Sequence, residues 1–145
     1  MKGDPIPEFH HVSRYCGFTT LKLDGFPSGT AFRLFPKDQE LLSVNWLEHL
    51  ELGSRDAEIA EVLSVLTRKM KKLGAQAKLA VLNVGQSRQF VQASAPDGRV
   101  LAFRHDPEVN PVPDPSHSGI VGMRLEDDLI ADLVALTVRE VHPTK

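Results

Sequence analysis

The side chains best suited to chemistry gather in three short polar segments, residues 10–16, 43–49 and 114–119. All three segments lie outside the apolar periodicity of the chain. They bring together imidazole, thiol, guanidinium and carboxylate groups, which are the groups that nucleophilic and acid–base catalysis uses. The candidate catalytic residues are His11, Arg14, Cys16, Asp114 and His117.

Cys16 is the candidate nucleophile of such a site. A cysteine attacks as its thiolate, and a nearby cation or histidine favours that form. Arg14 lies two residues away, and His117 could approach in space with Asp114 orienting its ring. A His/Cys/Asp site formed by the N-terminal segment and the Asp114–His117 loop would make the protein a small hydrolase or transferase. The alternative is that Cys16 is a small buried apolar residue, as free cysteines usually are.

Metal and phosphate binding are the other chemistries that these residue types allow. Neighbouring histidines on an extended strand point to opposite sides, and no recognised zinc signature matches the spacing of the histidines, Cys16 and Asp114. Residues 116–119 could hold a phosphate, but the acidic residues 126–128 already occupy the positive end of the helix expected there. We therefore expect no metal and no bound cofactor.

The composition excludes several classes of protein. The formal net charge is -2, which gives no general attraction to nucleic acid, and the basic residues 68–78 are explained by the end of a helix. One cysteine excludes an internal disulfide framework. No apolar run approaches the ~20 residues that span a membrane, and the N-terminus lacks the apolar core of a signal peptide. These features predict a cytoplasmic protein without membrane contact.

The elements that must position these side chains follow from the apolar pattern. The clearest is a helix over 54–73, with Ser54 as its N-cap and apolar residues spaced by three and four from Ile59 onward. A second helix is expected over about 126–142. The expected strands are 18–23, 30–35, 41–47, 78–84, 89–94 and 99–104.

Strands joined by short turns predict an α+β fold in the order βββαβββα. We expect a mostly antiparallel sheet of about six strands with two helices packed on one face. A chain of 145 residues has the length of one domain, here 1–145. Within it, residues 1–17 are expected to be irregular, and residues 107–118 form a proline-rich loop.

A second class of function is an accessory or partner-binding domain. The C-terminal helix carries two apolar rows, which predict burial together with a protein partner or a second copy at Leu133 and Val134. Trp46, the only tryptophan, would anchor an interface if it were partly exposed. Because no catalytic signature is present, the sequence favours a small soluble accessory domain of a bacterial-type intracellular protein assembly. The hydrolase or transferase is the alternative.

Overall fold

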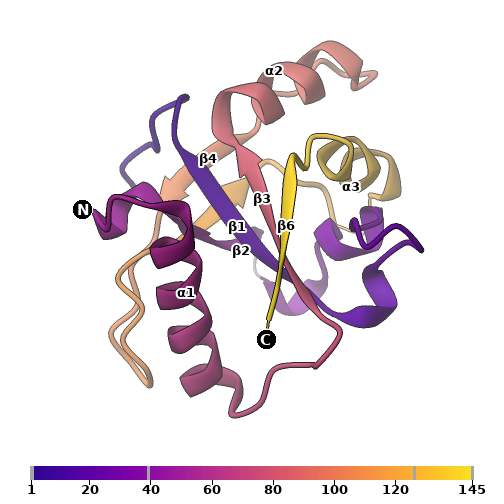
Figure 1. Ribbon diagram of the computed structural model, residues 1–145. Helices are drawn as coiled ribbons and strands as arrows, with labels where there is room; N and C mark the ends of the chain where they lie inside the picture. The colour runs from indigo at the N-terminus through magenta and orange to yellow at the C-terminus, as the bar shows by residue number, and fades with distance from the viewer. Residues whose placement is uncertain (1, 39, 126, 145) are drawn as a thin grey trace.

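The protein is described by a computed structural model that covers residues 2–38, 40–125 and 127–144. Within these residues, six strands form one sheet accompanied by three α-helices, which confirms the α+β class (Figure 1). Every pair of neighbouring strands is antiparallel, in the order β4-β5-β2-β1-β3-β6. The strands are β1 (His11–Cys16), β2 (Leu41–Trp46), β3 (Lys78–Asn83), β4 (Ala102–His105), β5 (His117–Val121) and β6 (Glu140–Pro143).

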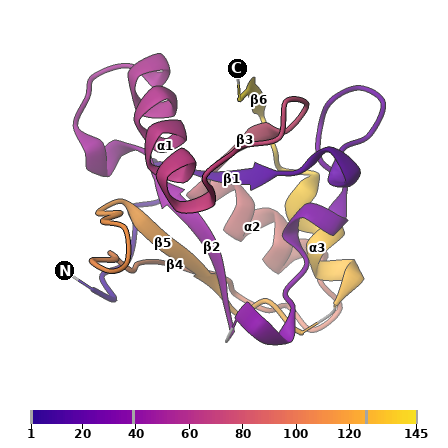
Figure 2. The ribbon, with the colours of Figure 1, turned by 90° about the horizontal axis from the view of Figure 1, so that it is seen from below.

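The helices cover both faces of the sheet rather than the single face expected. Helix α1 (Arg55–Met70) lies on one side, while α2 (Val84–Ser94) and α3 (Asp128–Ala135) lie on the other (Figure 2). Strand β3 shows why, since alternate side chains of a strand point to opposite faces. Leu79 and Val81 pack in the cluster of α1, whereas the larger cluster on the other side takes Ala80 and Leu82.

Local capping fixes where the three helices begin. The Ser54 hydroxyl accepts a hydrogen bond from Ala57 N at 3.2 Å, as the sequence predicted. Asn83 Oδ1 accepts from Gln86 N at 2.9 Å, so the chain turns directly from β3 into α2. Asp127 caps α3 in the same way, and Glu126, expected at this helix start, lies outside the described residues.

Several expected strands are helical or irregular, so the predicted order of elements is wrong. Short 3₁₀ helices occupy Phe18–Thr20 and Gly29–Phe32, where two strands were expected. Residues 89–94 belong to α2. Val84, Ser87 and Val91 are buried at spacings of three and four, which is the period of a helix and explains why the segment does not pair as a strand.

Three strands, β1, β5 and β6, form where the sequence predicted none. Residues 11–16, expected to be irregular, form β1 in the interior of the sheet, and the end of the 107–118 loop becomes the start of β5. The last helix stops at Ala135 instead of continuing to about 142. Thr137, Val138 and Val141 are β-branched and favour extended backbone, so the chain leaves α3 and forms β6.

The larger core cluster depends on the 3₁₀ helix Gly29–Phe32, which packs on α3. Phe32 is completely buried in this cluster, while Phe18 in the neighbouring 3₁₀ helix is 62% exposed. We expect Phe32→Ala to lower the free energy of unfolding by about 3–5 kcal/mol, because it leaves a cavity. Phe18→Ala is the matched control, with a change within about 0.5 kcal/mol. Urea unfolding followed by circular dichroism measures both, and equal losses would contradict this packing.

Candidate functional site

A polar pocket of about 280 Å³ lies on the α1 side of the sheet. Strands β1, β2 and β5 supply its floor with Ser13, Ser43, Asn45 and His117. The last turns of α1 and the loop before β5 form its walls with Leu66, Lys69 and Glu108. The pocket therefore brings together segments that are far apart in the sequence.

Ser43 and His117 form the hydrogen bond of most chemical interest in this pocket. The Ser43 Oγ lies 3.1 Å from His117 Nε2, and His117 Nδ1 lies 2.8 Å from the backbone carbonyl oxygen of Asp106. A carbonyl only accepts, so Nδ1 carries a proton, and in the neutral form of the ring Nε2 is the acceptor that faces the serine. The Asp106 carboxylate is also close, 3.4 Å from Nδ1. Ser43 is exposed and His117 is buried, so the hydroxyl is accessible while the ring is held in place.

Arg14 places a positive charge beside Ser43. Its Nη1 donates to the Ser43 carbonyl at 2.8 Å, and its Nε donates to the Ala31 carbonyl at 2.8 Å. Burial lowers the pKa of the guanidinium from its ordinary value. The charge of Asp38 acts against this lowering, although no carboxylate of the described residues forms a salt bridge with Arg14. A positive charge at this place could stabilise negative charge that develops at Ser43.

The carboxylate of Asp114 is fully buried and organises the far end of the pocket. It accepts from Lys69 Nζ at 2.8 Å and from Asn45 Nδ2 at 2.9 Å. Lys69 also donates to Glu108 at 2.6 Å. Burial acts to lower the pKa of Lys69, but the hydrogen bonds to Asp114 and Glu108 outweigh it and raise the pKa above its ordinary value. Lys69 is therefore charged at neutral pH, and its charge is compensated.

A second, outer hollow of about 440 Å³ meets the first pocket at Ser43, Glu108 and His117. Lys37 and Asp106 line this outer side. The hydroxyl of Ser43 therefore stands between two hollows. A molecule bound across it would have one part beneath α1 and the other toward solvent.

No family model, curated protein or solved structure matches this chain. Among the residues that the structure describes, no helix is long and apolar enough to cross a membrane. The same residues contain no group of three or more histidine, cysteine or acidic side chains arranged to hold a metal ion. The pocket itself is therefore the guide to function.

The structure brings some of the sequence-predicted site residues together and separates others. Arg14 and His117 line the pocket. Asp114 is not among the lining residues, and its carboxylate binds Lys69 instead of orienting the His117 ring. His11 lies outside the pocket lining, because its Nδ1 and backbone N are both bound by the Glu48 carboxylate at 2.6 and 2.7 Å. His11 is therefore not part of this pocket.

Cys16 lies in the core cluster on the opposite face of the sheet. His117 pairs with Asn45, which pairs with Ser13, so Cys16 is two strands across and three residues along from His117. At ordinary strand spacings this separates the two Cα atoms by about 14 Å. The structure therefore does not bring Cys16 and His117 together.

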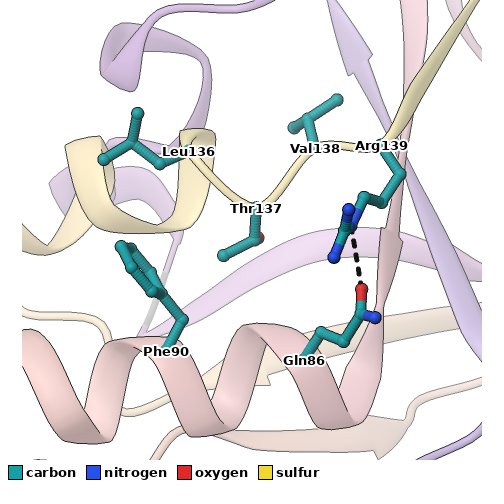
Figure 3. A pocket seen from close by; sticks show the side chains of 6 residues that line it. All are labelled: Gln86, Phe90, Leu136, Thr137, Val138 and Arg139. Carbon is teal, nitrogen blue, oxygen red and sulfur yellow. Dashed lines mark hydrogen bonds between the residues drawn. The ribbon is translucent and has the colours of Figure 1, made fainter.

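The residues expected at a partner interface are mostly internal. Leu133 and Val134 are buried in the protein's own core, so neither side chain is available to a partner in this conformation. Trp46 is half-buried, and its indole N–H donates to His10 Nδ1 at 3.0 Å. Leu136, the residue that follows α3, is exposed, and it lines a hollow of about 270 Å³ together with Phe90 of α2 (Figure 3).

The sequence placed Ser43 in a polar segment at the end of a strand, but it named neither Ser43 nor Lys69 nor Asp106 as a site residue. Ser43 and Asn45 alternate with the apolar residues of β2, which predicts only a solvent-facing side when helices cover one face. Lys69 has the pattern of a solvated helix end. For Ser43, the signal that could have identified it is the presence of two polar side chains, Ser43 and Asn45, on a strand that is covered on both faces.

Cys16 should be inert in the folded protein. Burial raises the pKa of its thiol to about 11, against an ordinary value of 9.0. At pH 8 about one thiol in a thousand is then ionised, compared with about one in ten after unfolding. We expect a disulfide exchange reagent at pH 8 to modify native Cys16 at least about a hundredfold more slowly than the protein in guanidinium chloride. Equal rates in the two states would mean that the thiol is not buried.

Proposed function

We propose that the protein is a small hydrolase in which Ser43 is the nucleophile and His117 is the general base. The observation that carries this proposal is the hydrogen bond between the exposed Ser43 hydroxyl and Nε2 of the buried His117, whose Nδ1 is fixed by a carbonyl. This is the arrangement that makes a serine hydroxyl reactive toward carbonyl compounds.

The reaction would begin with attack of Ser43 Oγ on the carbonyl carbon of an ester or amide. His117 Nε2 takes the hydroxyl proton as the new C–O bond forms, and returns it to the leaving group as the old bond breaks. A water molecule, deprotonated by the same nitrogen, then releases the acyl group and restores the serine. No oxidant or further co-reactant is needed.

Neighbouring charges support both states of this reaction. The Asp106 and Glu108 carboxylates lie 3.4 and 3.8 Å from the ring nitrogens of His117, so they stabilise the imidazolium that forms during attack. Arg14 donates to the Ser43 backbone and provides the positive charge for the oxyanion of the tetrahedral intermediate. In this proposal the site still lies between the N-terminal segment and the Asp114–His117 loop, but Ser43 replaces Cys16 as the nucleophile.

The proposal is tested by hydrolysis of 4-nitrophenyl acetate and by labelling with a fluorophosphonate. We expect Ser43→Ala to lower kcat/KM by about a thousandfold, because it removes the nucleophile. Mass spectrometry should locate the fluorophosphonate on Ser43 of the unmodified protein. Ser64→Ala, an exposed serine of α1, is the matched control and should keep full activity. Turnover that survives in Ser43→Ala, or labelling elsewhere, would refute the assignment.

A partner-binding function remains the second candidate, and one observation favours it. Leu136 is 69% exposed at the end of α3, and Phe90 lies beside it in the hollow of Figure 3. Exposed apolar side chains that gather at one place are typical of an interface with another protein. In this proposal a second copy of the chain covers the hollow between α2 and α3.

Sedimentation velocity measured over a range of protein concentrations tests the second candidate. If this face pairs, the sedimentation coefficient should rise with concentration, and Leu136→Ser should weaken the association by at least about tenfold by removing apolar contact. Leu23→Ser, at a fully exposed leucine far along the chain, is the control and should leave association unchanged. A protein that stays monomeric at every concentration would rule out self-association through this face.

A further inference from the structure

Asn45 presents a fixed hydrogen-bond acceptor to the 280 Å³ pocket. Both hydrogens of its Nδ2 are used, one by Asp114 Oδ1 and one by Ser116 Oγ, each at 2.9 Å. A carboxylate only accepts, so the amide cannot turn its oxygen toward Asp114. Its Oδ1 therefore faces the pocket, where none of the described residues donates to it.

Ser13 lies beside Asn45 with an unsatisfied hydroxyl. The two residues pair across β1 and β2 and line the same pocket. Ser13 is 1% exposed, and its Oγ has no hydrogen-bond partner among the described residues. Buried polar groups are nearly always hydrogen-bonded, and an exception next to a pocket indicates a group that a ligand satisfies.

The opposite wall provides a donor and an apolar surface. Lys69 has three N–H groups, and the carboxylates of Asp114 and Glu108 account for two of them. Leu66, one turn earlier on α1, lines the pocket beside it. The pocket thus combines one fixed acceptor, a hydroxyl and an ammonium donor around a short apolar wall.

We infer that this pocket binds the terminal carboxamide of the substrate's acyl chain, an inference that rests on the proposed hydrolase function. The ligand NH₂ donates to Asn45 Oδ1, and the ligand carbonyl accepts from Lys69 and Ser13. A neutral ligand fits because two carboxylates already compensate Lys69, while a cationic ligand would meet both Lys69 and Arg14. A carboxylate would place negative charge against Asn45 Oδ1 and Glu108.

The strand geometry sets the length of that acyl chain. Ser43 and Asn45 are two residues apart on one face of β2, which separates their Cα atoms by about 6.6 Å. A reacting carbonyl at Ser43 and a carboxamide at Asn45 are therefore joined by a short chain of two or three methylenes, which packs against Leu66. The leaving group occupies the outer hollow beyond Ser43.

A matched pair of chromogenic esters tests this specificity. The 4-nitrophenyl esters of 4-carbamoylbutanoic acid and 5-methylhexanoic acid have the same shape, and only the first carries a carboxamide. We expect kcat/KM to favour the carbamoyl ester by at least about tenfold after subtraction of its spontaneous hydrolysis. The reason is that the carboxamide forms hydrogen bonds with the pocket and the branched alkyl group forms none. The monoester of glutaric acid, ending in a carboxylate, should be the poorest of the three.

Variants assign the preference to the pocket. Ser13→Ala should lower the ratio of the two kcat/KM values by about threefold or more, and this ratio is independent of how much protein is folded. Ser64→Ala should leave it unchanged. A ratio near one, a preference for the carboxylate ester, or a ratio unaffected by Ser13→Ala would each overturn the carboxamide site while hydrolysis by Ser43 stands. Absence of hydrolysis with all three esters, and of labelling at Ser43, would instead overturn the hydrolase itself.

Discussion

The need to satisfy one fully buried carboxylate organises the site. An ionised Asp114 without partners would be too costly to bury, so the fold brings it an ammonium and an amide. These come from Lys69 on α1 and Asn45 on β2. The loop that carries Asp114 leads directly into His117, so the same network fixes where β5 begins and where the imidazole lies.

Coverage of both faces of the sheet explains why a pocket exists at all. The cluster beneath α1 is small and contains Leu47, Ile59, Val62, Leu79 and Val81. Leu63 and Leu66 pack against it, so it extends under most of α1, and polar side chains meet the end of the helix at Lys69. The larger cluster on the other face holds α2 and α3 and provides most of the core. Burial on one face thus stabilises the sheet, while the other face leaves room for the polar pocket.

The sequence predicts best the elements that carry one clear period. Helix α1, with its Ser54 cap, and the apolar strand β3 were expected within a few residues of their observed bounds. Helix α2 was missed because residues 89–94 were expected to form a strand, although the Asn83 side chain caps a helix that begins at Val84. Strand β1 was missed because four of its six residues are polar or aromatic, and pairing with β2 and β3 decides its conformation.

The candidate site was predicted only in part, because residue types are visible in the sequence and contacts between distant residues are not. His117, Arg14 and Asp114 were recognised from their chemical types and were found within one network. Ser43 could not be chosen from the sequence, because a serine becomes reactive only through a neighbour that is distant along the chain. Cys16 drew attention by its type, yet alternation along β1 turns its side chain to the opposite face.

The proline-rich loop before β5 closes on itself just outside the site. The backbones of Glu108 and Asp114 exchange two hydrogen bonds, from Glu108 N to the Asp114 carbonyl at 3.1 Å and from Asp114 N to the Glu108 carbonyl at 2.9 Å. The residues between them form a tip whose two ends are held together, and Val109 and Asn110 at this tip are exposed. Extra residues inserted there would lengthen the tip without moving either end. This chain therefore offers a place to attach an affinity tag or a fluorescent reporter close to Ser43 while the pocket keeps its shape.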